Sequence, residues 1–320
     1  MRSLSGASLT LGLLGLAATI GCSQVGMVQA RRDFKAANAA YQQQDYKKAA
    51  ELYEQTLKED PTLSKAYFYL ANSYDNQFKP SRKGDATNDA LLEKAVNNYQ
   101  LCADKLQGST DPVDKQLAVR SLEYLQAAYG PDKLNDPAKA EPIVQKMIQS
   151  DPGEPANYFV LAKLYEDAGA YPEAEQTLLN AKAAKPSDPA VYMTLAGYYN
   201  RQGQFDKTID SLEQRAKVEP NNPEAFQTIA TFYWDKAYRD ATLKEPQKRE
   251  YLQKGIEAVD QAIKIKPDYM EALVYKGLLL RLEANLEKDA KKQAELMKEA
   301  NALRDRAEEL RKKKAAGVGE

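Results

Sequence analysis

A pattern that recurs after 34 residues, between positions 155 and 222, constrains this chain more than any other feature. The matching positions are Tyr158 and Tyr192, Leu161 and Leu195, Ala162 and Ala196, Gly169 and Gly203, and Pro186 and Pro220. A fixed period of this length is the signature of a stacked helical repeat. The repeat therefore predicts how the protein is built, but it says much less about which molecule the protein binds.

Each copy of the repeat predicts a pair of helices. In the first copy, Tyr158, Leu161 and Tyr165 have the spacing that places apolar residues on one helical face. Gly169 then ends this helix, a second apolar stripe follows, and Pro186 ends the second helix because proline lacks the N–H. One pair cannot bury its apolar faces alone, so neighbouring pairs must stack.

These residues resemble the tetratricopeptide repeat family. The resemblance covers the small, large and proline positions of both copies, and it departs at Thr208 and Arg215, where the family usually has alanine. It implies an all-α fold, a right-handed α-solenoid of stacked antiparallel helix pairs.

The same pattern, followed along the chain, predicts about seven repeats. We expect them near residues 30–63, 64–105, 113–152, 155–188, 189–222, 223–267 and from 270–280 onward. A long charged helix over 281–314 is expected to cap the solenoid, with a tail at 315–320. Extra residues interrupt the second and sixth repeats near 75–89 and 234–250, and they either bind a partner or only extend the helices.

The N-terminus predicts an export signal. No charged residue occurs between Arg2 and Arg31, and the apolar run 9–20 has the length of a signal-peptide core. This run is short for a membrane span. A spanning helix over 3–30 and an ordinary cleaved signal remain alternatives.

The end of this run, Thr19 to Ser23, resembles the lipid-attachment signal of bacterial lipoproteins. The resemblance implies that residues 1–21 are a signal peptide, that Cys22 is lipidated, and that 22–29 form a short tether. It also implies a lipid-anchored protein of the bacterial envelope, at the outer membrane and facing the periplasm, because serine follows the cysteine. The inner membrane, reached by an N-terminal span, is the alternative location.

Composition leaves little room for catalysis. The 320 residues include no histidine, and 45 basic residues balance 46 acidic ones. Without histidine the chain lacks the usual general base and the imidazole metal ligand, and it has no phosphate-cradling glycine loop. We therefore expect no enzyme, cofactor, metal site or small-molecule substrate, with a carboxylate-dependent enzyme as the weakest alternative. A pI of about 5.9 without a basic stripe disfavours nucleic acid.

Binding of protein or peptide partners is the function that the resemblance implies. In the family, the first helix of each pair lines a concave groove. Carried over copy by copy, the groove positions are Asn38, Tyr41, Phe68, Asn72, Asp75, Phe159, Lys163, Glu166, Met193, Asn200, Arg201, Gln227, Thr231 and Trp234. The carboxylate clamp of chaperone-binding members is not expected, because Phe34 and Tyr69 stand where that clamp needs lysine and asparagine.

The sequence thus predicts a lipid-anchored scaffold or adaptor, acting in envelope, pilus or polysaccharide assembly. A self-assembling spacer between envelope layers is the alternative from a different class. Trp234, the one tryptophan, begins an insertion, and we expect it to pack that insertion rather than to anchor a partner.

Overall fold

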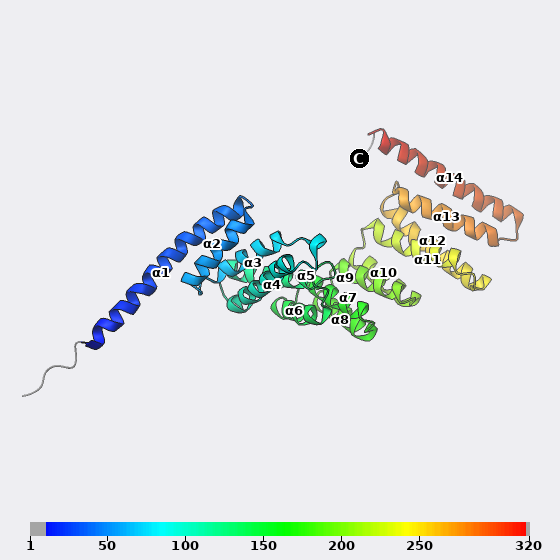
Figure 1. Ribbon diagram of the computed structural model, residues 1–320. Coiled ribbons are helices and arrows are strands. Elements are labelled where there is room, and N and C mark those ends of the chain that lie inside the picture. The colour runs from blue at the N-terminus through cyan, green and yellow to red at the C-terminus, as the bar shows by residue number, and fades with distance from the viewer. Residues whose placement is uncertain (1–10, 318–320) are drawn as a thin grey trace, which may run out of the picture. The chain divides into compact units, whose positions relative to one another are not determined.

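The computed structural model describes residues 11–317, and for residues 11–24 it describes the backbone alone. Within this range the chain forms fourteen α-helices, one 3-10 helix and no strand (Figure 1). The chain divides into two compact units, unit 1 up to Gly153 and unit 2 from Glu154 onward.

Unit 1 contains three helix pairs. The first helices of the pairs are α1 (Leu11–Gln42), α3 (Ser64–Gln77) and α5 (Pro112–Ala128). The second helices are α2 (Tyr46–Glu59), α4 (Ala86–Leu106) and α6 (Pro137–Ser150), with the 3-10 helix η1 (Pro80–Arg82) between α3 and α4. Each second helix packs on its own first helix, and α2 and α4 also pack on the first helix of the next pair.

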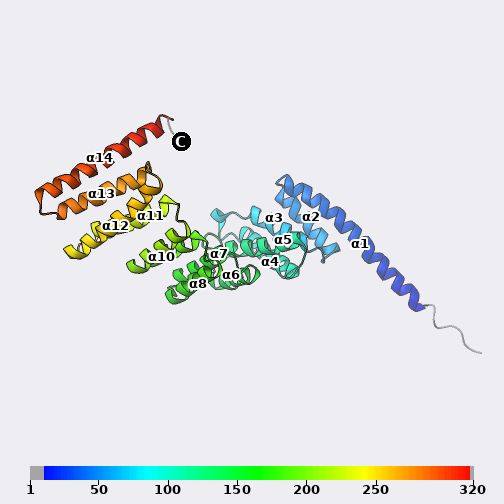
Figure 2. The ribbon, with the colours of Figure 1, turned by 180° about the vertical axis from the view of Figure 1, so that it is seen from behind.

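Unit 2 contains four helix pairs of the same kind. Its first helices are α7 (Pro155–Asp167), α9 (Pro189–Arg201), α11 (Pro223–Arg239) and α13 (Met270–Leu286). Its second helices are α8 (Tyr171–Ala184), α10 (Phe205–Val218), α12 (Glu245–Ile265) and α14 (Ala290–Ala315). Views from two opposite sides show α11 to α14 lying side by side in chain order (Figures 1 and 2). The predicted all-α fold of stacked antiparallel pairs is confirmed.

Short polar caps and glycine turns set the helix boundaries. The side chain of Asp188 accepts a hydrogen bond from the Ala190 N–H at 3.0 Å, and Asn222 does the same for Glu224. Each cap is followed by proline at the first helical position, where a missing N–H costs nothing. Between the helices of one pair, Gly169 has φ of +75°, a conformation that glycine adopts without a Cβ clash.

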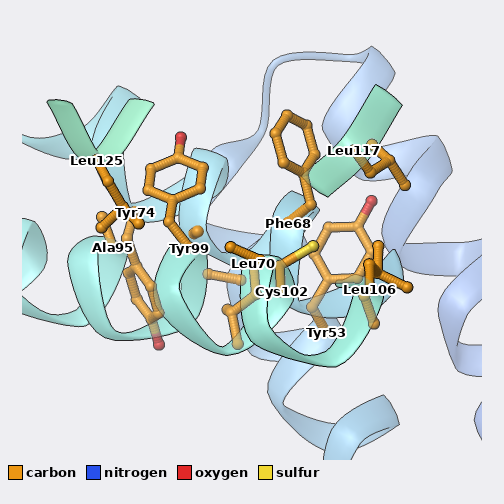
Figure 3. Packing of buried hydrophobic residues seen from close by; sticks show 14 of the residues in the cluster. Tyr53, Phe68, Leu70, Tyr74, Ala95, Tyr99, Cys102, Leu106, Leu117 and Leu125 are labelled. Atoms are coloured by element: carbon orange, nitrogen blue, oxygen red, sulfur yellow. The ribbon is translucent and has the colours of Figure 1, made fainter. Parts of the chain in front are cut away.

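The core of unit 1 is built from tyrosines and small residues. Tyr53, Tyr99 and Leu125 are fully buried (Figure 3). Cys102 lies among them and is buried, and this burial raises the pKa of its thiol. A buried thiol of raised pKa behaves as a small apolar side chain rather than as a nucleophile.

The two insertions extend helices and add short loops. The second helices α4 and α12 each have 21 residues, whereas α8 and α10 have 14. In unit 1 the added loop is fixed by the buried Asn88, whose amide nitrogen donates to the carbonyl oxygens of Lys79 and Arg82. Asn88 also accepts from the Lys79 N–H at 2.9 Å.

The structure differs from the sequence-based boundaries near both termini. Residues 22–29, expected as a short tether, are helical within α1, because no proline interrupts the chain between positions 11 and 42. The expected single helix over 281–314 is divided between α13 and α14. Asp289 begins α14 by accepting from the N–H groups of Lys291 and Lys292 at 2.8 and 3.2 Å.

Candidate partner-binding face

The candidate site is the surface presented by the first helices, which we call the first-helix face of each unit. In unit 1 it belongs to α1, α3 and α5, and α3 contacts both of the others. In unit 2 it belongs to α7, α9, α11 and α13. The predicted groove residues lie on these helices, and the structure gives them different roles.

Two of the residues predicted to line the groove of unit 1 are buried. Phe68 is 5% exposed and Asn72 is 4% exposed. Asn72 accepts a hydrogen bond from the Tyr41 hydroxyl at 2.5 Å and donates one to the Tyr99 hydroxyl at 3.0 Å. Phe68 and Asn72 are therefore mostly covered by neighbouring side chains, and both residues contribute to the packing of the helix pairs.

The other predicted residues of unit 1 are also bonded within the fold. Asn38 accepts from the Tyr53 hydroxyl at 2.6 Å. Asp75, whose side chain is 8% exposed, forms an ion pair with Lys133 at 2.5 Å. Asn38 and Tyr41 are both half-buried.

Three aromatic residues missing from the prediction contribute to the first-helix face of unit 1. Tyr69 packs edge-on against Phe34 and Tyr41, with ring centroids 6.2 and 5.6 Å apart. Tyr124 is 36% exposed and stacks on Tyr99 at 5.0 Å. Phe34 and Tyr69 occupy the positions at which the clamp residues were absent. In the sequence, the aromatic residues found at these two positions were the signal that aromatic side chains contribute to this face.

The charged groove residues of unit 2 all form ion pairs within the fold. Arg201 donates two hydrogen bonds to the Glu166 carboxylate, from Nε at 2.8 Å and from Nη2 at 2.9 Å. Arg201 holds the pKa of Glu166 below its ordinary value, and Glu166 raises the pKa of Arg201. Lys163 forms an ion pair with Asp167. The Glu166–Arg201 pair links α7 to α9, whereas the Lys163–Asp167 pair lies within α7. Together they leave the face without a free charge at these positions.

Uncharged side chains occupy the rest of the predicted set in unit 2. Met193 is 38% exposed, Asn200 is exposed, and Phe159 is half-buried. The Met193 sulfur accepts a hydrogen bond from Nη1 of the buried Arg215 at 3.0 Å. The Gln227 side chain donates to the Thr231 hydroxyl at 2.7 Å.

Trp234 packs within an aromatic group that the sixth pair shares with the seventh. Its ring stacks on Tyr238 at 5.1 Å and meets Tyr275 edge-on at 5.9 Å. Tyr238, which lies in the insertion, is 60% exposed. Trp234 therefore packs against the insertion, as expected. The exposed ring of Tyr238 covers one face of the Trp234 ring.

Comparison with known families agrees with the helix pairs. Residues 34–95 and residues 133–198 each match a profile of the tetratricopeptide repeat. The chain contains tetratricopeptide repeats. The first segment runs from within α1 to within α4, and the second contains α6, α7 and α8 and ends within α9.

Solved structures with similarity to these repeats are distant in sequence. The C-terminal part of a TPR repeat-containing protein from Cytophaga hutchinsonii is 18% identical, covering 84% of this chain and 95% of that chain, with a TM-score of 0.49. A MamA structure from Desulfovibrio magneticus RS-1 is 15% identical, covering 58% and 95%, with a TM-score of 0.38. YrrB, described as a TPR protein with an unusual peptide-binding site, is 17% identical, covering 75% and 88%, with a TM-score of 0.27. Among curated proteins, none matches this sequence.

Residue Cys22 precedes the first tetratricopeptide repeat. Its backbone is helical within α1, and its side chain lies outside the described part of the structure. Residues 1–10 of the predicted signal peptide also lie outside the described residues. Over the described part of the chain, none of the helices combines the length and the apolar character that a membrane span requires.

Proposed function

We propose that this protein is a scaffold of the bacterial envelope, which binds protein partners through the first-helix faces of its tetratricopeptide repeats. The observation that carries the proposal is the set of large apolar and aromatic side chains that the first helices leave exposed. Tyr124 of α5, Met193 of α9 and Val274 of α13 are 36%, 38% and 42% exposed. Exposed aromatic and apolar side chains on a rigid scaffold are typical anchors for a partner chain.

The anchor in this proposal is a lipid on Cys22. The motif that ends at Ser23 supports it, and the helical backbone of α1 adds a geometric consequence. Eight helical residues between Cys22 and Ala30 span about 12 Å, whereas an extended tether of that length would reach roughly 28 Å. A lipid at Cys22 would therefore hold the first helix pair close to the bilayer, at the outer membrane in our proposal. Assembly of outer-membrane, pilus or polysaccharide structures is the setting that we propose.

Replacing Cys22 by alanine is expected to abolish lipid labelling and to release the protein from the membrane. The thioether that carries the lipid requires the cysteine sulfur, so the variant has no acyl chains to hold it in the bilayer. The measurement is palmitate labelling and fractionation of cells that express either form, with crosslinking before lysis. Membrane-bound, unlabelled protein in both strains contradicts the lipid anchor. Recovery of no crosslinked partner from wild-type cells contradicts the scaffold.

A further inference from the structure

The arginines on the first-helix faces of the two units differ in whether they form ion pairs. In unit 2 the guanidinium of Arg201 is occupied by Glu166. In unit 1, Arg120 of α5 is exposed and forms no ion pair with any residue that the structure describes. Arg31 of α1 is likewise exposed and unpaired within the described residues. Arg31 and Arg120 of unit 1 are therefore free of ion pairs over the described part of the chain, whereas Arg201 of unit 2 is not.

Both free arginines stand one helical turn before an aromatic residue. Arg120 precedes Tyr124 by four positions, and Arg31 precedes Phe34 by three. Residues with these spacings share one face of a helix. Arg120 also lies close enough to the Tyr41 hydroxyl to lower the pKa of that group, against the larger effect of burial, which raises it. Arg120 therefore shares the Tyr124 side of α5 and lies near the Tyr41 hydroxyl.

The aromatic rings on this side of unit 1 are continuous from helix to helix. Tyr69 of α3 contacts Phe34 and Tyr41 of α1, and beneath them it stacks on the fully buried Tyr53 of α2, with ring centroids 6.0 Å apart. Phe68 then joins Tyr69 to Tyr124, with centroids 5.4 and 5.9 Å away. An extended chain lying across α1, α3 and α5 would meet a partly exposed ring on each helix, namely Phe34, Tyr69 and Tyr124, with Arg31 on α1 and Arg120 on α5.

We propose that the first-helix face of unit 1 selects an extended acidic peptide segment that also carries apolar or aromatic side chains. A carboxylate of the segment pairs with Arg120, and its apolar side chains lie on Tyr69 and Tyr124. The planar guanidinium suits this role because its donors match the two oxygens of a carboxylate. This inference rests on the proposed function, since it names the class of partner that the same face binds.

The net charge of the chain does not by itself attract an acidic polymer. The formal net charge is −1 at pH 7, so a long acidic peptide meets weak overall repulsion. Binding of an acidic segment must therefore come from a local arrangement. The unpaired arginines beside the rings supply one, and Arg201 in unit 2 does not because Glu166 already occupies it.

Two labelled polymers test the inference with the full chain. Fluorescein-labelled random copolymers of glutamate with tyrosine, and of lysine with tyrosine, are titrated with the protein at low salt and followed by fluorescence polarisation. We expect the acidic copolymer to bind about tenfold more tightly than the basic one. Arg120→Gln should weaken its binding by about fivefold to tenfold, and Arg120→Lys should retain most of the affinity. Arg201→Gln, which removes the same charge from unit 2, should change the affinity by less than about twofold, because that guanidinium is already occupied.

Three results overturn the inference. They are equal binding of both copolymers, binding of neither, and an Arg120→Gln variant that binds like wild type. None of them removes the proposed function, because a partner crosslinked to the same face in cells would still show that the face binds protein. Arg120 is exposed, so its replacement is not expected to affect folding, and thermal unfolding monitored by circular dichroism checks this.

Discussion

Replacing Tyr99 by alanine is expected to lower the free energy of unfolding of unit 1 by about 3–5 kcal/mol, the range for truncating a large buried aromatic residue. Tyr99 is fully buried in the core between α3, α4 and α5, and its ring stacks on Tyr124. Its hydroxyl accepts a hydrogen bond from the buried Asn72. The substitution removes the ring and leaves an amide donor unsatisfied. Urea unfolding, with amide hydrogen exchange of α3 and α4 as the local readout, measures the loss.

The matched control is Tyr99→Phe, which keeps the ring and removes the acceptor alone. It should cost about 1–3 kcal/mol, the penalty for an unsatisfied buried donor. If phenylalanine and alanine cost the same, the ring does not pack as the structure shows. If phenylalanine costs nothing, the Asn72 hydrogen bond is not formed.

Replacing Gly255 by valine is expected to destabilise unit 2 by about 3 kcal/mol, because overpacking of a filled core displaces its neighbours. Gly255 lies in α12, where a Cβ atom would stand 2.9 Å from Cδ2 of Leu279 and 3.2 Å from Cβ of Tyr233. The close packing of α12 on α11 and α13 depends on the absence of a side chain at this position. Denaturant unfolding, with hydrogen exchange of α11 to α13, reports the effect.

Gly197 in α9 provides the control for this prediction. A Cβ atom there would meet only Nη1 of Arg201 at 3.4 Å, the end of a flexible side chain. Gly197→Ala should therefore stabilise the protein by about 0.5–1 kcal/mol, the gain in helix propensity. A Gly255→Val variant as stable as wild type would mean that α12 does not lie against Leu279 as the structure shows.

The repeat period was sufficient to predict the fold. A helix-ending glycine and proline recur in each clear copy, and every pair has an apolar face that only a neighbouring pair can cover. The division between α13 and α14 was missed because Asp289 lies in a run of charged residues that favours helix throughout. Its capping role appears only when its side chain is seen to accept from Lys291 and Lys292.

The candidate face was harder to predict than the fold. Periodicity places Phe68 and Asn72 outside the core stripe of α3, but it does not show how far the neighbouring side chains extend over them. Tyr41 and Tyr99 reach over Asn72 and bury it. Charges raise the same difficulty, because Glu166 and Arg201 are separated by 35 positions and their pairing depends on how α7 stacks on α9. Only the structure separates a paired arginine from the free Arg120.

Site-specific photocrosslinking in cells that produce the protein naturally tests the central claim most directly. A photoreactive residue is placed at Tyr124 or Met193 on the first-helix faces, and at Leu101 of α4, a second helix, as a control of similar exposure (43%). The account predicts a discrete crosslinked partner from at least one of the two first-helix positions and none from Leu101. A partner captured from Leu101 alone, or from no position while the protein remains folded and in place, would contradict it.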